Sequence, residues 1–420
     1  MEEPLEPSHD EKSTSRDNSA HGADRKKEVI LKACSSRDLD ALRALAESPG
    51  GFLTDSIRQQ ACKCSEPLKP AGPILLGLPP NQDKEESHHP DGTASASWES
   101  LPRHKDEDQV QLDVNRAFIY YPEHQTEAQL THHKNLLSTL IVSLLRTHPY
   151  LCYFQGYHDI AQVLLLTLPA HLHLPSLTRL SLFRIRDFML PSLAPAVAQL
   201  RLIPDILRHA DPPLWRHLSA TEPFFALSGT LTMYAHDITT QGEIARLFDV
   251  LLARDPAFTV YLFAALVRSR RDELFDTPPD EPEMLHSILS KLPVPLDLDR
   301  LIAQAVALER DVPPERLPSW RRGVSRWSVL KTGRLARGKG GPEEIPGLEQ
   351  GRVWFEKQVR ELRWQEKKKA AGRWVWRNRR PAGMVGVAIL VGVLAVLLRR
   401  ESGPVAAGLQ LVLRFLARWR

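Results

Sequence analysis

The chain is poor in cysteine, and this limits both its covalent chemistry and its compartment. The four cysteines in 420 residues are Cys34, Cys62, Cys64 and Cys152. Four are too few for a disulfide framework in a chain of this length, and residues 1–40 are polar and charged, so no secretory signal opens the sequence. Both observations favour a reducing, cytosolic setting for the main domain.

Clusters of metal ligands are also missing. The pair Cys62 and Cys64 has no second pair elsewhere, as a zinc site would require. Closely spaced histidines have no carboxylate or third ligand at useful spacing, so we expect them to face solvent: His88-His89, His132-His133 and His171 with His173. We predict no bound metal.

Alternating strand patterns are absent as well. From Val110 to about Arg310 the apolar residues recur at helical spacing, and prolines divide the segments at helix-sized intervals. One clear example is Leu136, Leu137, Leu140, Ile141, Leu144 and Leu145. The sequence therefore predicts an all-α fold. We expect a domain over residues 24–312, with a polar surface loop over 80–108 and disorder over residues 1–23.

Positive charge is scarce over most of the chain and concentrated near its end. Residues 1–312 carry 31 Lys and Arg against 43 Asp and Glu, which makes nucleic acid a poor candidate partner. Residues 313–380 carry 19 Lys and Arg against 7 Asp and Glu. We predict that they form a basic juxtamembrane linker, helical from about Gln350 to Ala371, whose charge attracts anionic lipid head groups.

Residues 381–398 contain no charged side chain at all, and arginine pairs flank them on both sides. At 1.5 Å per residue a helix of this length reaches about 27 Å, enough for a thin bilayer. A buried core helix is the alternative, but nothing downstream could cover it. We predict a transmembrane helix over 381–398 and an amphipathic tail over 399–420. Arginines on both sides leave a tail anchor and a re-entrant hairpin both open.

Two short segments carry the functional interpretation. The first combines an aliphatic residue, an aspartate and an arginine at intervals of three, and the second is Tyr-x-Gln-Gly. Their fixed positions are Val110, Asp113, Arg116, Tyr153, Gln155 and Gly156. Either motif alone is weak, but in this order, with a helix between them, they resemble the signature motifs of the TBC-domain family of Rab GTPase-activating proteins. The resemblance covers about residues 36–310.

The resemblance implies an activity that completes another protein's active site, and it leaves open whether the chain counts as an enzyme in its own right. Arg116 is expected to act as an arginine finger that neutralises charge on the transferring phosphate. Gln155 is expected to orient the attacking water. Judged alone, each residue would more often be an ordinary surface side chain. No cofactor is expected, because Mg²⁺ and GTP arrive with the GTPase.

Four further residues are predicted to support these two. Asp113 lies one helical turn before Arg116 and could orient it. Tyr153 and Asp159 are expected to brace the loop that presents Gln155, and Gly156 permits a tight backbone there. His158 beside Asp159 suggests a catalytic dyad, but neighbouring residues of a helix point to different faces, so we interpret both as structural.

The second motif, Arg186-Asp187-Phe188-Met189 and the apolar tail together resemble the endoplasmic-reticulum-anchored branch of the family. That branch implies an endoplasmic reticulum membrane location, a cytosolic catalytic domain and a role in traffic to the Golgi. The sequence departs from the family pattern at residues 62–72. They interrupt a Trp-Pro-x-Leu-Leu motif, and the tryptophan of that motif is missing. We interpret them as an insertion or a gene-model error.

Two functions of other classes stay open. A non-catalytic, membrane-anchored adaptor could keep the scaffold as a Rab docking surface, although both finger residues are present. A membrane-shaping protein could work through its basic segment and tail alone. The sequence does not identify the Rab, the oligomeric state or the regulation, because partner choice depends on surfaces spread over many helices.

Overall fold

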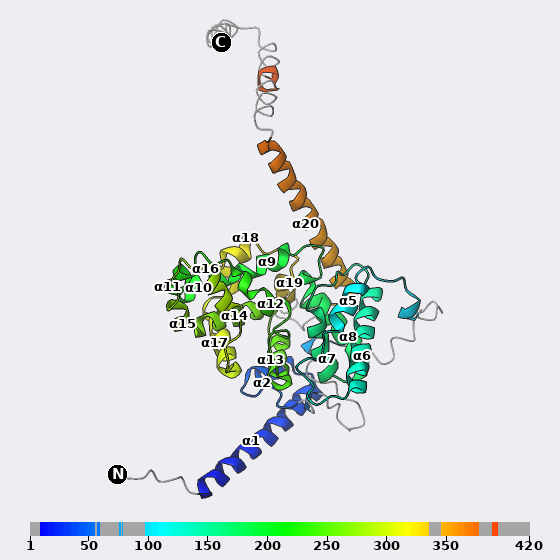
Figure 1. Cartoon of the computed structure of the whole chain (residues 1–420), viewed down its shortest axis with the longest axis vertical. Helices are drawn as coiled ribbons and strands as arrows, with labels where there is room; N and C mark the ends of the chain where they lie inside the picture. Colours follow the sequence, from blue (N-terminus) through cyan, green and yellow to red (C-terminus); the bar gives the residue numbers. More distant parts are fainter. Residues whose placement is uncertain are drawn as a thin grey trace. The chain divides into compact units, whose positions relative to one another are not determined.

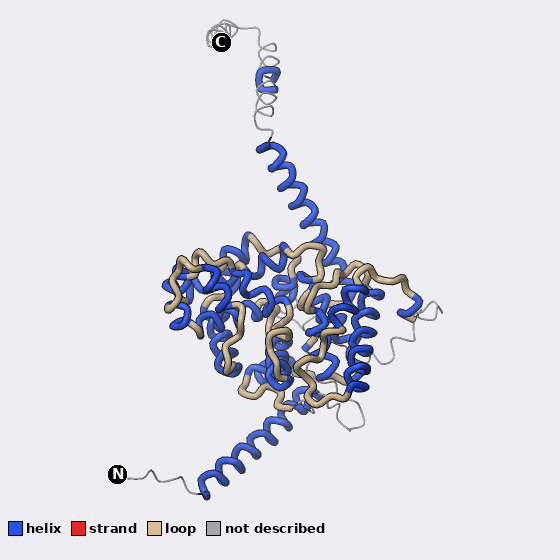
Figure 2. Tube along the Cα trace, in the orientation of Figure 1, coloured by secondary structure: helices blue, strands red, loops and turns tan. Residues whose placement is uncertain are grey.

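The computed structural model describes residues 9–54, 57–58, 75–76, 78, 97–335, 346–377 and 389–393. Over these residues the chain consists of helices joined by loops and contains no strand (Figure 2). The prediction of an all-α fold is therefore confirmed. The chain divides into two compact units, residues 1–358 and residues 359–420.

The helices are labelled as in Figure 1. The first are α1 His9–Ser36, α2 Leu39–Glu47, η2 Trp98–Ser100, α5 Glu107–Val114, α6 Glu127–Thr147, α7 Tyr157–Thr167, α8 Ala170–Phe183 and η3 Arg186–Phe188. The next are α9 Ala194–Leu200, α10 Leu202–Ala210, α11 Pro212–His217, η4 Pro223–Ala226, α12 Leu227–Leu231, α13 Gln241–Ala253, α14 Phe258–Ser269 and α15 Arg271–Phe275. The last are α16 Pro282–Leu289, α17 Leu298–Asp311, η5 Pro314–Arg316, α18 Pro318–Arg322, α19 Val329–Leu335 and α20 Leu348–Arg377.

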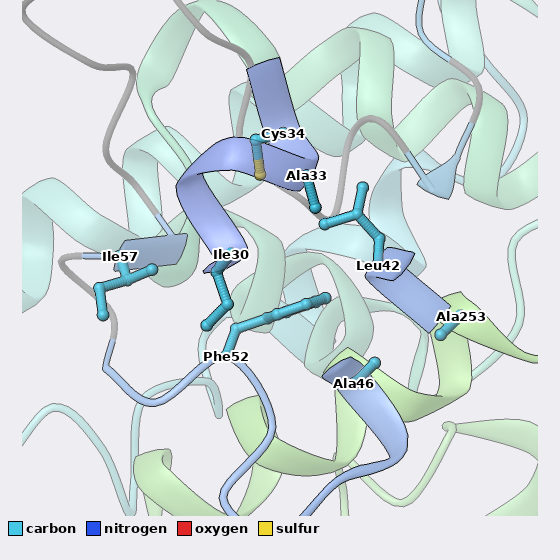
Figure 3. Close-up of a cluster of buried hydrophobic side chains, with 8 residues drawn as sticks. All are labelled: Ile30, Ala33, Cys34, Leu42, Ala46, Phe52, Ile57 and Ala253. Carbon is cyan, nitrogen blue, oxygen red and sulfur yellow. The ribbon is translucent and has the colours of Figure 1, made fainter. Parts of the chain in front are cut away.

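The N-terminal helices close one side of the domain. Apolar residues of α1 and α2 pack around Phe52, together with Ala253 at the end of α13 (Figure 3). Helix α1 begins at His9, so part of the segment that we expected to be disordered is helical. The reason lies in the sequence, because no proline interrupts residues 9–48 and the helix can extend beyond its apolar part.

Helices α5, α6, α7 and α8 lie side by side and form the wall that carries both sequence motifs (Figure 1). Helix α6 begins with a capping box, in which Thr126 and Gln129 satisfy each other's backbone N–H groups. Its buried face includes Leu137, Ile141 and Leu144, each fully covered. This buried face fixes α6 between the helix that precedes the arginine and the helix that follows the glutamine.

The segment after residue 312 differs from the predicted linker. Its described residues form η5, α18 and α19, and it buries Trp320, Val324, Val329 and Leu330. The high charge of this segment led to the wrong prediction, because these few apolar residues are spaced among many lysines and arginines. Residues 314–335 and the first turns of α20 therefore belong to the domain.

A buried polar cluster holds this C-terminal segment in place. Arg186 and Asp187 of η3 are 0% and 1% exposed. Asp187 accepts hydrogen bonds from Gln199 Nε2, Ser328 Oγ, the Val329 backbone N–H and Gln358 Nε2. Arg186 donates to the carbonyl oxygens of Leu182 and Trp327 and to Thr332 Oγ1. We refer to these groups as the Arg186–Asp187 cluster. It joins η3 to residues 327–332 and to α20.

Helix α20 confirms the prediction of a helix from about Gln350 to Ala371. Beyond Gln358 its described side chains are mostly exposed, including Trp364, Trp374 and Trp376. None of the helices within the described residues is long and apolar enough to cross a membrane. Of the predicted transmembrane segment only residues 389–393 are described, and residues 62–72 and 399–420 lie outside the described residues.

Candidate functional site

A cavity of about 880 Å³ lies where both sequence motifs meet. Its walls come from the end of α5, the loop before α7, the segment after η3, and α12 with the turn that follows it. The lining includes all six residues predicted from the sequence, namely Asp113, Arg116, Tyr153, Gln155, Gly156 and Asp159. Two stretches of chain about forty residues apart are thus brought together, as the motif interpretation requires.

Arg116 follows the C-terminus of α5, in a turn where its backbone N–H donates to the Asp113 carbonyl oxygen at 3.0 Å. Its side chain is exposed at the cavity. Among the described residues, no carboxylate or carbonyl group pairs with this guanidinium. An arginine that is exposed and unpaired in the free protein can bind an anionic group of a partner without first breaking an ion pair.

The Asp113 carboxylate bonds to side chains other than that of Arg116. Its side chain is 3% exposed, and within the described part of the chain it forms no ion pair with Arg116. Instead it accepts hydrogen bonds from Gln109 Nε2 at 3.0 Å and from the Tyr153 hydroxyl at 2.9 Å. Because Tyr153 belongs to the loop before α7, Asp113 joins the arginine-bearing helix to the glutamine-bearing loop.

Gln155 lies in a tight turn directly before α7. Gly156, the N-cap of α7, has φ +94°, which favours glycine. A Cβ atom at Gly156 would lie 2.6 Å from Thr232 Cγ2, so any larger residue would collide with the turn after α12. Gln155 is exposed at the cavity, and its amide has no hydrogen-bond partner among the residues described.

Tyr153 holds this loop through its backbone N–H and its hydroxyl. Its backbone N–H donates to Asp106 Oδ2 at 3.0 Å, and its hydroxyl donates to Asp113. Burial raises the pKa of the Tyr153 hydroxyl, and the neighbouring Asp113 carboxylate raises it further. The hydroxyl therefore stays protonated and serves as a fixed donor rather than as an acid.

The contacts of Asp159 extend the network to a residue that the sequence did not reveal. Asp159 Oδ1 lies 3.2 Å from His158 Nε2, and its Oδ2 lies 3.0 Å from His236 Nδ1. Burial lowers the pKa of His158, although Asp159 and Asp113 oppose this effect. The hydrogen bond to Asp159 raises the pKa of His236. His158 and Asp159 are thus in direct contact, and both lie in a bracing network.

His236 could not be recognised from the sequence, because it lies 77 residues beyond Asp159 in an irregular turn between α12 and α13. Nothing in the local pattern distinguishes it from a solvent-facing histidine. The structure gives it a hydrogen bond to Asp159 and a place in the cavity wall.

Part of the cavity wall is apolar. Ile119 and Leu193 are 72% and 54% exposed, and the deeper residues Phe188 and Leu190 are buried. Exposed apolar side chains lie here beside a cation and an amide that have no partner within the described part of the chain, an arrangement that suits a protein partner which buries them on docking. Within the described ranges, no group of three His, Cys, Asp or Glu side chains could hold a metal ion.

Comparison with known proteins identifies the family of this chain. The model of the Rab-GTPase-TBC domain matches residues 73–275. The GTPase-activating protein gyp10 of Schizosaccharomyces pombe is 33% identical over 350 residues, covering 82% of this chain and 86% of that protein. TBC1 domain family member 20 of Homo sapiens is 32% identical over 301 residues, covering 70% of each chain.

Among solved structures, the crystal structure of the Ypt/Rab-GAP domain of Gyp1p matches 67% of this chain and 98% of its own. The TM-score is 0.49 and the sequence identity is 16%.

Proposed function

Because this chain belongs to the TBC-domain family of Rab GTPase-activating proteins, we propose that it accelerates GTP hydrolysis on a Rab by supplying Arg116 and Gln155 to the nucleotide site of that GTPase. One observation carries this proposal. The guanidinium and the amide are both exposed at a single cavity and have no polar partner among the described residues, while the segments that present them are joined by the Tyr153–Asp113 side-chain hydrogen bond.

The chemistry of the two side chains suits this role. GTP hydrolysis on a small GTPase needs positive charge against the developing phosphate charge and a group that orients the attacking water. Arg116 supplies the charge and Gln155 the orienting group. Neither step needs a cofactor of this chain, because Mg²⁺ and GTP are bound by the partner. The apolar wall formed by Ile119, Leu193 and Phe188 offers a surface for the GTPase itself.

The test is single-turnover GTP hydrolysis by a panel of Rab proteins with the full-length chain. Arg116→Ala should lower the stimulated rate by about 10³–10⁵-fold. Gln155→Ala should also abolish most of the stimulation. Arg201→Ala is a matched control, because Arg201 is exposed and lies outside the cavity. Undiminished hydrolysis with Arg116→Ala would refute the arginine assignment.

The same panel separates this proposal from the non-catalytic adaptor. An adaptor would bind a GTP-loaded Rab without accelerating hydrolysis, and substitution of Arg116 or Gln155 would leave its binding unchanged. Stimulation by the wild-type chain that depends on both residues would exclude the adaptor.

We further propose that the chain acts at the endoplasmic reticulum membrane in traffic to the Golgi. The membrane location is supported by the sequence, where residues 381–398 are uncharged and the basic charge of residues 313–380 lies beside them. The organelle is supported by the resemblance to the endoplasmic-reticulum-anchored branch. An anchor would raise the effective concentration of the activator near a lipid-anchored Rab. Removing residues 381–420 should move the protein from the membrane fraction to the soluble fraction. Retention on membranes after this deletion would contradict the anchor.

A further inference from the structure

Gln162 is a buried polar residue that the proposed mechanism leaves unused. It lies in the second turn of α7 and is 4% exposed. Its Oε1 accepts the Phe118 backbone N–H at 3.0 Å, and its Nε2 donates to the Tyr121 carbonyl oxygen at 3.4 Å. Both partners belong to the loop that follows Arg116, so one side chain of α7 holds this loop at two backbone positions.

This loop needs such support because its backbone is irregular. Phe118 has φ +61°, a value that residues with a side chain rarely adopt. Its ring stacks on His133 of α6 with the ring centroids 5.3 Å apart. His133 is thus half-buried against the loop, not facing solvent as the sequence suggested. On the other side of Arg116, Lys134 Nζ donates to the Asn115 carbonyl oxygen at 2.7 Å.

The Arg116 side chain itself makes no polar contact within the described residues, so the position of its guanidinium depends on the loop backbone. Gln155 directly precedes the N-cap of α7, and Gln162 lies in the same helix. One short helix therefore presents the amide at its start and holds the arginine loop by its second turn. The separation of the two groups is thus set by α7 and by the Tyr153–Asp113 hydrogen bond rather than by contact between them.

We propose that Gln162 is a positioning residue, which fixes Arg116 relative to Gln155 through its hydrogen bonds to the backbone of residues 118 and 121. This inference rests on the proposed function and adds a residue to it. A small displacement of a group that stabilises the transition state, here the Arg116 guanidinium, lowers the reaction rate strongly. Loosening this loop should therefore lower the stimulated hydrolysis rate by about tenfold to a hundredfold. Binding of the GTP-loaded Rab should change little.

The test uses Gln162→Met, which keeps the side-chain length and removes the polar atoms. A Rab that the wild-type chain activates is loaded either with GTP or with GDP and aluminium fluoride, a mimic of the transferring phosphate. The full-length chain should prefer the second form, and this preference reports the fit of Arg116 in the transition state. As a ratio of two affinities, it does not depend on how much of the protein is folded.

Gln162→Met should reduce this preference about tenfold or more, with affinity for the GTP form within about threefold of wild type. In an Arg116→Ala background it should cause no further reduction. The matched control is Gln199→Met, because Gln199 is also 4% exposed and loses one hydrogen bond, to Asp187 at 2.8 Å, away from both loops. This control should keep the wild-type preference.

Three results would overturn the inference: an unchanged preference in Gln162→Met, an equal further loss in the Arg116→Ala background, or an equal loss in Gln199→Met. Thermal melts of each variant identify any that do not fold. If Gln162→Met does not fold, Gln162→Asn is used, since it is one methylene too short to reach Phe118 but remains polar. A wild-type chain that stimulates no Rab would refute the proposed function instead.

Discussion

Replacing Asp187 by alanine should strongly destabilise the domain, although Asp187 lies outside the cavity. Its carboxylate is 1% exposed and accepts four hydrogen bonds, from groups in α9, in the segment 328–329 and in α20. Alanine would leave all four donors without this acceptor in a buried site. It would also leave the neighbouring Arg186 guanidinium without its nearby negative charge.

The expected magnitude follows from these contacts. Removing one partner of a buried charged group typically costs about 3–5 kcal/mol, and each buried donor left unpaired costs about 1–3 kcal/mol before the structure relaxes. We take about 3–5 kcal/mol as the expected loss in the free energy of unfolding. A domain is typically stable by only about 5–15 kcal/mol, so the loss would be a large part of the total. The melting temperature should fall by roughly 4–8 °C, because the entropy of unfolding of a domain of this size is large.

The measurement is urea unfolding of the full-length chain, followed by circular dichroism and by tryptophan fluorescence. Asp311→Ala is the control, because the Asp311 side chain is 61% exposed and, among the described residues, its carboxylate pairs only with Arg310. It should change the free energy of unfolding by less than about 0.5 kcal/mol. A loss below about 1 kcal/mol in Asp187→Ala would show that the Arg186–Asp187 cluster does not hold the C-terminal segment to the domain.

Two further predictions concern the cavity. Gly156→Ala should lower the stimulated hydrolysis rate at least about tenfold, because the positive φ costs about 1–2 kcal/mol and the new Cβ would lie 2.6 Å from Thr232 Cγ2. Adding Thr232→Ser should restore part of the rate. A wild-type hydrolysis rate with Gly156→Ala would contradict the need for this tight turn. The pKa of His236 is raised by Asp159, so the stability that His236 adds is fully present below about pH 6.5 and is lost as the pH rises through its raised pKa. In urea, the free energy of unfolding of wild type should therefore exceed that of His236→Gln by more at about pH 6 than at about pH 8.5. Because buried His158 is present in both proteins, its opposite contribution cancels in this comparison. A difference that does not change with pH would show that the contact with Asp159 does not persist in solution.

The fold could be predicted where apolar spacing is dense and regular. The five leucines and one isoleucine used to predict helix over 136–145 lie within α6, and most of them are buried. Prediction failed after residue 312, where burial depends on a few apolar residues among many charges and on Asp187, more than 100 residues earlier. Hydrogen bonds between such distant residues leave no periodic signal in the sequence.

The candidate site could be predicted as a set of residues but not as a set of contacts. Motif resemblance identified Arg116 and Gln155, and the structure brings both to one cavity. It did not show that Asp113 bonds to Tyr153 instead of Arg116, or that His236 and Gln162 take part. Spacing along a helix indicates which side chains share a face, but partners on other helices compete for the same groups.

The dual use of α7 restricts which changes of length the domain can accept. Successive residues of an α-helix are turned by about 100°, so one inserted or deleted residue between Gly156 and Gln162 would rotate the Gln162 side chain away from Phe118. The glutamine turn would remain intact while the arginine loop lost its support. Surface loops elsewhere can lengthen freely, but the number of residues in the first two turns of α7 is fixed by geometry.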